Sequence, residues 1–249
     1  MATVLLSACA SEAAQQGPGD TITDTVAETT MVTEPPTTTT TVAPTTTAPP
    51  PVAPAPAPTD GLVPVTGRIT TTDPVIFVTM DDGTDRDPAI VDYLEATSMP
   101  VSMFLNAQYL NANPAYFASI TALGNVAHSH TLNHAKLPNL TAAEQRTEIC
   151  GMKDLIAEKL GSVGSLMRPP YGAYNAITRE QAATCGITAV VMWAGELQNG
   201  ALKLQGPAMR AGDIYLMHFR PDTVANLIEI RRLADANGFR IARLESYLS

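Results

Sequence analysis

The sequence lacks features that would assign it to several common classes of protein. No apolar stretch is long enough to span a bilayer, and no glycine-rich loop of the nucleotide-binding kind follows any of its apolar runs. It also has no basic run, and its formal net charge is −9 over 249 residues. These absences argue against a nucleotide-binding fold and give no electrostatic footprint for nucleic acid, so we expect no nucleic-acid partner.

Lysine and arginine are also missing from the first 60 residues, which carry much of the negative charge and leave a nearly balanced remainder. From residue 21 this segment reduces to Thr, Pro, Ala and Val, a composition that cannot bury enough apolar surface to fold. We therefore expect residues 10–60 to be a disordered, Thr/Pro-rich spacer held extended by proline, and residues 61–249 to form the folded, catalytic domain. A nearly balanced domain suits a neutral polymer as partner.

The beginning of the chain resembles an export signal. Leu6-Ser7-Ala8-Cys9 is similar to the bacterial lipobox, in which the cysteine becomes the lipidated first residue after cleavage. We interpret residues 1–9 as the remnant of such a signal. This predicts an extracytoplasmic protein, either secreted or held at the cell surface, whose contact with a membrane is limited to a lipid on Cys9.

Beyond residue 61, apolar runs alternate with amphipathic helical patterns, and this alternation predicts a parallel sheet. With about seven strands, we expect an α/β fold of the distorted (β/α) barrel type and not an open doubly wound sheet. The predicted strands cover 75–80, 101–107, 125–130, 165–169, 187–193, 213–218 and 239–244, and the predicted helices cover 88–97, 114–123, 141–160, 175–184 and 222–237.

The first predicted strand ends on two adjacent carboxylates, Asp81 and Asp82. Adjacent anions in a partly dry place are most simply compensated by a bound cation, which would leave one carboxylate for proton transfer; the alternative is a solvated acidic turn. His130 and His134 lie four residues apart after another predicted strand. One Asp with two His leaves open positions on a divalent metal, so together these residues favour a catalytic metal site over a structural one.

Two further strand ends carry reactive side chains. Arg168 stands in a proline-rich loop, where it could orient a carboxylate, and His218 ends the next-to-last predicted strand. A surface ion pair for Arg168 and a hydrogen-bonded core position for His218 are the alternatives. All four histidines fall at or just beyond a predicted carboxyl end of a strand, where barrels of this type build active sites.

Four motifs, in this order, resemble motifs one, two, three and five of the polysaccharide deacetylases of carbohydrate esterase family 4, the NodB-homology domain. The resemblance covers roughly residues 73–249. It implies a distorted (β/α) barrel and metal-dependent removal of N- or O-acetyl groups from polysaccharides. The motifs are Thr79-Met80-Asp81-Asp82-Gly83, His130-Thr131-Leu132-Asn133-His134, Arg168-Pro169-Pro170-Tyr171-Gly172 and Leu216-Met217-His218.

The resemblance also implies a role for each matched residue. Asp81 would be the general base, Arg168 its positioning partner and His218 the general acid. A divalent metal, usually zinc with cobalt as the alternative, would be bound by Asp82, His130 and His134. The backbone N–H of Tyr171 would help to bind the oxyanion, Leu216 would line the acetate pocket, and Trp193 would form a wall of the groove.

Motif four departs from the family pattern. The family has an aspartate and a tryptophan there, and the aspartate tunes the acid histidine, whereas residues 191–198 of this chain supply Trp193 and Glu196. Glu196 is the candidate replacement, with the register left open. His128 has no family role, and we expect it to be an ordinary hydrogen-bonded side chain.

Cys150 and Cys185 remain once Cys9 is set aside, and we expect a disulfide that ties the long helix to the end of the next. The predicted function is hydrolysis of acetyl groups on an acetylated polysaccharide by a monomer, with peptidoglycan or a chitin-like polymer as partner and acetylated xylan or another exopolysaccharide left open. A catalytically silent carbohydrate-binding relative is one alternative. A small-molecule C–N hydrolase of the same fold, with a closed pocket, is the other.

Overall fold

Strand β2 (Val75–Asp82) is the centre of the fold in the computed structural model, which describes residues 62–248. All of its residues are buried except Asp82, because the strand has neighbours on both edges. It pairs in parallel with β3 (Ser102–Leu105) on one side and β9 (Ile214–His218) on the other, and its first residues also pair with β10 (Arg240–Ile241). The predicted buried strand is confirmed, and it runs two residues further, through both aspartates.

In the described part of the chain, ten strands form the sheet, in the order β1-β6-β5-β4-β3-β2-β9-β7-β8 with β10 beside β2. Every ladder is parallel except the one between β7 and β8. The carboxyl ends of the parallel strands therefore meet at one end of the sheet, where the polar motifs of the sequence gather. The other strands are β1 (Val65–Thr66), β4 (Val126–Ser129), β5 (Leu166–Met167), β6 (Ala189–Val191), β7 (Gly195–Gln198) and β8 (Ala201–Leu204).

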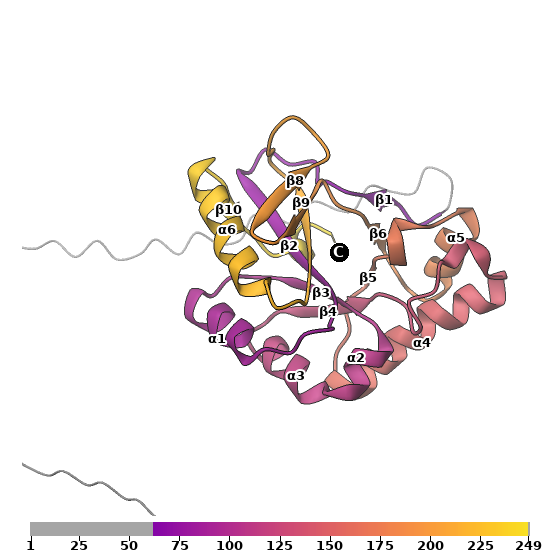
Figure 1. Cartoon of the computed structure of the whole chain (residues 1–249). Helices are drawn as coiled ribbons and strands as arrows, with labels where there is room; N and C mark the ends of the chain where they lie inside the picture. The colour runs from indigo at the N-terminus through magenta and orange to yellow at the C-terminus, as the bar shows by residue number, and fades with distance from the viewer. Residues whose placement is uncertain (1–61, 249) are drawn as a thin grey trace, which may run out of the picture. The chain divides into compact units, whose positions relative to one another are not determined.

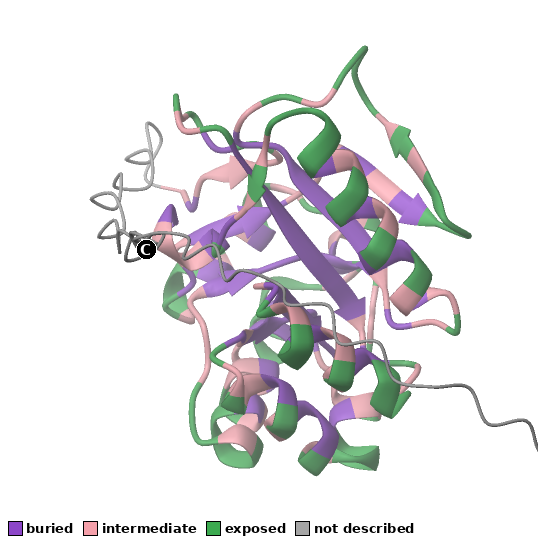
Figure 2. Cartoon of the chain, turned by 90° about the vertical axis from the view of Figure 1, so that its left-hand side faces the viewer, coloured by how far each residue is buried: buried purple, intermediate pink, exposed green. Residues whose placement is uncertain are grey.

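Helices cover the outer side of the curled sheet (Figure 1). Buried residues lie in the strands and on the inner faces of the helices, while the outer helix faces are exposed (Figure 2). Thr141 and Glu144 form a capping box at the start of the longest helix. The helices are α1 (Pro88–Thr97), α2 (Ala107–Ala112), α3 (Pro114–Ala122), α4 (Ala142–Leu160), α5 (Ala176–Thr184) and α6 (Thr223–Ala236), with short 3₁₀ turns η1 (Leu137–Asn139), η2 (Pro170–Gly172) and η3 (Leu244–Ser246).

The barrel is distorted because its edges do not pair with each other: within residues 62–248 no ladder joins β1 to β8. Instead, the segment after β1 crosses to the start of β9. The N–H of Ile69 donates to the carbonyl of Gly212 (2.8 Å), and Arg68 Nε donates to Asp213 Oδ1 (2.5 Å). Gly212 is required here, since its φ is +82° and an added Cβ would lie 1.9 Å from the Ile69 oxygen. We call this crossing, residues 67–69 against 212–213, the seam.

The fold class predicted from the sequence is confirmed, with the main helices in place and the predicted strands shorter. The strand expected at 101–107 ends at Leu105, because Ala107 already begins α2. The strand expected at 165–169 is only Leu166–Met167, since the prolines that follow have no N–H for a ladder. The prediction missed β1, α2 and the β7–β8 hairpin.

The predicted Cys150–Cys185 disulfide is confirmed, joining α4 to the end of α5 with a Cα–Cα distance of 5.0 Å. Among the described residues, no helix is both long and apolar enough to cross a membrane. The predicted signal remnant 1–9, with Cys9, and the spacer 10–60 lie outside the described residues.

Candidate active site

Asp81 and Arg168 form a buried ion pair beneath the site. Arg168 Nη1 donates to Asp81 Oδ1 at 2.6 Å, and the two side chains are 0% and 2% exposed. Nη1 also donates to Thr79 Oγ1 (2.8 Å), and Nε and Nη2 donate to the carbonyls of Val191 and Met192. Because Arg168 is held from four sides, it fixes one oxygen of Asp81 in place and leaves the other facing the site.

Burial lowers the pKa of Arg168, and the charge of Asp81 opposes this shift. The guanidinium also lies over the ring of Phe104, 4.4 Å from its centroid. The surface ion pair considered for Arg168 is therefore wrong: the side chain is a buried support of the site.

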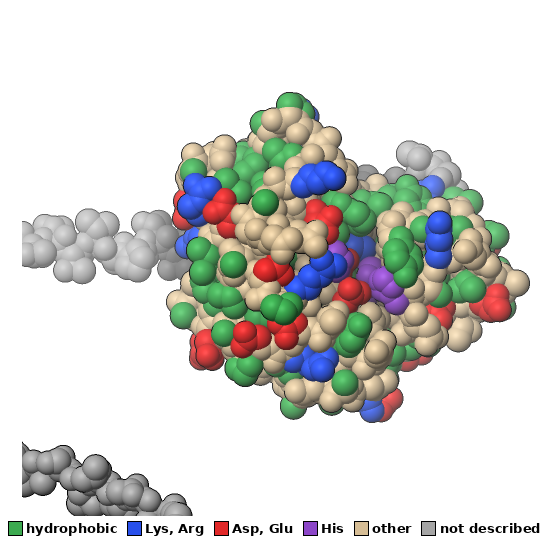
Figure 3. All heavy atoms as spheres, viewed as in Figure 1, with side chains coloured by type: hydrophobic (Ala, Val, Ile, Leu, Met, Phe, Trp, Pro, Cys, Tyr) green, Lys and Arg blue, Asp and Glu red, His purple; other side chains and the backbone are tan. Residues whose placement is uncertain are grey.

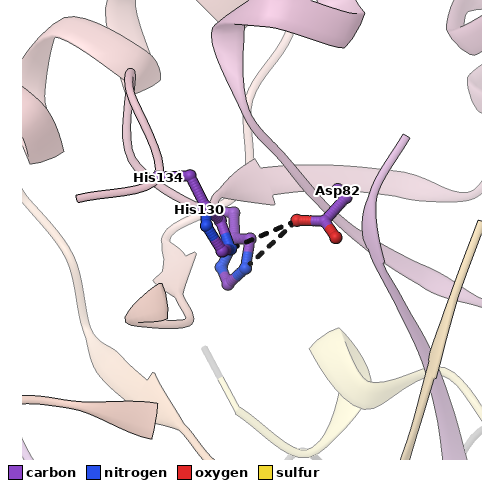
Figure 4. Close-up of side chains that lie close together, drawn as sticks. All are labelled: Asp82, His130 and His134. Carbon is purple, nitrogen blue, oxygen red and sulfur yellow. Dashed lines mark ion pairs between the residues drawn. The ribbon is translucent and has the colours of Figure 1, made fainter. Parts of the chain in front are cut away.

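Asp82, His130 and His134 converge beside this pair (Figure 4). Asp82 Oδ1 lies 3.6 Å from His130 Nε2 and 3.4 Å from His134 Nε2. The strand end carries Asp82, and the loop after β4 carries both histidines. The sheet thus brings together three residues that are up to 52 positions apart in the sequence.

Hydrogen bonds orient both imidazoles. His130 Nδ1–H donates to the carbonyl of Arg168 (2.7 Å), which leaves Nε2 as the acceptor that faces Asp82. Burial lowers the pKa of His130, and the charges of Asp81 and Asp82 only partly offset this. His134 Nδ1 hydrogen-bonds with the Tyr171 hydroxyl (3.2 Å), with Nδ1–H as donor when Nε2 faces Asp82.

Backbone strain gathers at the same place. Asp82, Thr131, His134 and Tyr171 all have a positive φ, between 54° and 74°, although none is glycine. Such conformations cost on the order of 1–3 kcal/mol each and persist where the surrounding structure holds them for a function. Four of the six such residues of the described chain lie in this site.

The cluster fits a divalent metal ion. The three candidate ligand atoms all lie within 4.8 Å of one another. Ligands at about 2.0–2.1 Å around a tetrahedral ion are roughly 3.4 Å apart, close to the two distances to Asp82 Oδ1. The carbonyl bound to His130 Nδ1 supplies the outer hydrogen bond that metal-binding histidines usually make.

The cluster opens into a surface cavity of about 310 Å³. Figure 3 shows histidine side chains in this hollow, with acidic and basic side chains around it. Tyr171 at the rim is 70% exposed, and its N–H has no hydrogen-bond partner among the described residues. The lining is Asp81, Asp82, His130, His134, Pro169, Tyr171, Gly172, Trp193, Glu196, Leu216, His218 and Arg220. Of the nine predicted site residues, eight line this cavity and Arg168 supports its floor.

His218 lines the same cavity as Asp82, His130 and His134, at the end of β9 and in register with Asp81. Its Nδ1 lies 3.6 Å from Glu196 Oε1, and both side chains are partly exposed to the cavity. Glu196 comes from β7, the strand that the sequence did not predict. The structure thus puts Glu196 beside His218, where the family pattern has an aspartate.

The sequence interpretation missed three contributors. Thr79 accepts from Arg168, and Arg220 lines the cavity. Asn106, the N-cap residue of α2, donates from Nδ2 to Asp82 Oδ1 (3.4 Å). Thr79 is the first residue of motif one and Arg220 lies two residues after His218, so closeness to a motif was the available signal. His128 agrees with its expectation, since it is buried and hydrogen-bonded away from the cavity.

A curled half-barrel of parallel strands with its polar motifs at the carboxyl ends is the fold of the NodB-type deacetylases. Residues 68–190 match the family described as polysaccharide deacetylase. An uncharacterized protein of Streptomyces coelicolor is 38% identical over 196 residues, which are 75% of this chain and 78% of that one. The chain therefore belongs to the polysaccharide deacetylases, the hydrolases of carbohydrate esterase family 4.

A second relative matches a shorter segment of the chain, and a solved structure matches it at lower sequence identity. A chitin deacetylase of Pestalotiopsis is 33% identical over 104 residues, which are 40% of this chain and about a third (35%) of that protein's length. A carbohydrate esterase family 4 pseudoenzyme from Bacillus anthracis has a TM-score of 0.65 at 16% identity, covering 74% of this chain and 69% of that one. The second likeness concerns the fold alone.

Proposed function

We propose that the chain hydrolyses N-acetyl groups of an extracytoplasmic polysaccharide, with a divalent metal, most simply zinc or else cobalt, held by Asp82, His130 and His134. The observation that supports this most directly is the single cavity that joins these three residues to Asp81 and His218. A cation held there would polarise the acetyl carbonyl and ease deprotonation of the attacking water. Hydrolysis of O-acetyl esters is the second candidate reaction, since the alcohol of an ester leaves with less need for a proton from a general acid than the amine of an amide.

Each proton transfer has a residue of this chain in reach of the cavity. Asp81 accepts the proton of the attacking water through Oδ2, the oxygen that Arg168 leaves free. His218 lines the same cavity, and it donates the proton that the departing amine needs. The N–H of Tyr171 would bind the oxyanion, and Leu216 and Trp193 would provide apolar contact for the acetyl group.

An exposed site and a disulfide support a polymer outside the cytoplasm as substrate. The cavity is open at the surface, as a polysaccharide chain requires and a small-molecule hydrolase does not (Figure 3). The Cys150–Cys185 disulfide is typical of an oxidising compartment. Together with the predicted signal and spacer, these features favour a cell-wall glycan or a chitin-like polymer as substrate. The protein itself would be attached to the membrane through a lipid on Cys9, or secreted.

The direct test is acetate release from N-acetylglucosamine oligomers by the full chain, stripped with chelator and resupplied with zinc or cobalt. Activity should return with metal. It should fall about 100-fold or more in Asp81→Asn and His218→Ala, because general acid–base catalysis contributes about 10²–10⁴-fold. Asp92→Asn, an exposed residue on α1, is the matched control and should retain wild-type activity.

Failure has a defined meaning. If the protein binds metal and oligosaccharide but releases no acetate from an oligomer or a small acetyl ester, the proposed function is wrong. The chain is then a carbohydrate-binding relative without catalysis. Activity confined to a small amide, with none on oligomers, would instead favour a small-molecule hydrolase.

A further inference from the structure

A second cavity of about 370 Å³ lies on the other side of Trp193 from the catalytic one. Trp193 lines both, so the indole is a shared wall. We call this cavity the arginine pocket. It is lined by Gly67, Arg68, Trp193, Ala194, Gln205, Gly206 and Arg210, and none of these residues is acidic.

The charge balance of the arginine pocket is positive. Asp213 pairs with Arg68 and is 1% exposed: it accepts from Arg68 Nε, from the N–H of Arg210 (2.8 Å) and from the Tyr215 hydroxyl (3.0 Å). One negative charge thus offsets Arg68. The side chain of Arg210 makes no ion pair among the described residues, so one guanidinium charge remains available to a ligand.

The arginine pocket is also built on rigid structure. Arg68 belongs to the seam, where Ile69 and Gly212 join the two edges of the barrel. The Gln205 amide fixes Trp193 from the pocket side. With its oxygen toward the indole, Gln205 accepts from Trp193 Nε1 (3.1 Å), and Gln205 Nε2 donates to the Trp193 carbonyl (3.1 Å). Arg68 and the indole wall are therefore held in place by contacts within the protein.

A polysaccharide that places an acetylated sugar in the catalytic cavity must place a neighbouring sugar near Trp193. Arginine recognises a carboxylate through paired N–H donors, and an exposed guanidinium does so at little cost of desolvation. From this geometry we infer that the arginine pocket binds a carboxylate carried by the sugar next to the one deacetylated. The substrate is then an acidic glycan, such as one with alternating lactyl-ether sugars (N-acetylmuramic acid), and not neutral chitin. This inference rests on the proposed function, because the neighbouring sugar lies near Trp193 only if the acetylated sugar occupies the catalytic cavity.

The test uses three tetrasaccharides with the full chain: one alternating N-acetylglucosamine and N-acetylmuramic acid, the methyl ester of the same compound, and neutral chitotetraose. Trp193 is the only tryptophan of the sequence, so its fluorescence reports binding at both cavities. We expect the acid to bind about three- to tenfold more tightly than its ester, as one partly exposed charged hydrogen bond contributes. Arg210→Gln should remove this preference while leaving the affinity for the two neutral ligands unchanged.

Two further variants sharpen the result. Arg210→Lys keeps the charge and should retain most of the preference, and Arg231→Gln, on α6 and outside the pocket, should behave as wild type. Equal affinity of the wild type for acid and ester would overturn the inference, as would an Arg210→Gln variant that weakens all three ligands alike. If the acid is preferred in binding but no tetrasaccharide loses acetate, the arginine pocket stands and the proposed function fails.

Discussion

Glu196 and His218 face each other from neighbouring parallel strands, with 3.6 Å between Glu196 Oε1 and His218 Nδ1. The β7–β9 register pairs Glu196 with Leu216, two residues before His218, and so sets both side chains on the cavity side. A carboxylate at this distance can hold the imidazole in one orientation within the cavity. The glutamate side chain thus reaches His218 from β7, a strand that the sequence did not predict.

Replacing Glu196 by Gln should lower kcat by about three- to tenfold and leave KM nearly unchanged. The substitution keeps the shape of the side chain and removes a charge that is partly screened by solvent, so the loss is smaller than that of removing His218 itself. Steady-state kinetics on N-acetylglucosamine oligomers measure it.

The matched control for Glu196 is Lys203→Gln. Lys203 lies opposite Glu196 in the β7–β8 ladder and is exposed, so its loss perturbs the same hairpin without touching His218. An unchanged kcat in Glu196→Gln would mean that His218 needs no carboxylate partner. An equal loss in both variants would mean that hairpin stability alone is being measured.

Zinc should stabilise the chain against heat if Asp82, His130 and His134 bind it. A ligand at about 100 times its Kd contributes about 2.7 kcal/mol, which corresponds to roughly 5–10 °C in Tm for a domain of this size. Chelator should reverse the shift, and His134→Ala should abolish it because one of three ligands is lost. Differential scanning fluorimetry across a zinc titration provides the readout.

Lys136→Gln serves as the control for the zinc experiment, since Lys136 is exposed and lies in the same loop as His134. It should show the full zinc shift. A shift that survives in His134→Ala would place the metal elsewhere in the chain and contradict the assigned ligands.

Much of the fold was predictable because its signals are local. The apolar run before Asp81, the capping box at Thr141 and the glycine after α4 each specify an element within a few residues. The β7–β8 hairpin had a local signal too: Asn199-Gly200 forms a two-residue turn with φ of 53° and 71°, the conformation that hairpins favour. The short, half-exposed strands around it hid that signal.

The site was less accessible to sequence, because its contacts join distant residues. Nothing local to Glu196 indicates His218, since their contact depends on the register of a strand that was not predicted. The seam is harder still: Arg68 and Asp213 are separated by 145 positions and form one isolated bridge. The motif residues were predictable only because their types and order resemble a family.

Loss of the Cys150–Cys185 disulfide should cost stability and leave chemistry alone. The bond closes a loop of 35 residues, which in the chain-entropy description corresponds to about 3–4 kcal/mol. The double variant Cys150→Ser/Cys185→Ser should therefore melt roughly 10 °C lower, with near-normal kcat at a temperature where it is folded. Wild-type protein in reductant should have the same Tm as the variant. Equal Tm values for the wild type with and without reductant would show that the bond adds nothing to stability.

Glu245 should make the stability of the chain depend on acid pH. This half-buried residue on η3 accepts from Ser102 Oγ (2.6 Å) and from His128 Nε2–H (2.8 Å), whose Nδ1 accepts from the N–H of Leu166. Burial alone would raise the pKa of Glu245, but these hydrogen bonds outweigh it and lower the pKa below its ordinary value. A carboxyl with a depressed pKa stabilises the folded state above its unfolded pKa, near 4.3–4.5, and loses that contribution as the pH falls through the folded pKa.

Glu245→Gln should therefore melt lower than wild type at pH 7, by about 1–3 kcal/mol in free energy of unfolding, because a charged hydrogen-bond acceptor is lost. The difference between the two proteins should shrink as the pH falls from about 5 to 3, since wild type then loses the same contribution. Tm measured at each pH tests this, with Glu95→Gln on the exposed face of α1 as control. A constant difference from pH 7 to 3 would mean that Glu245 binds its proton equally in both states, and that its link to His128 contributes only packing between η3 and β4.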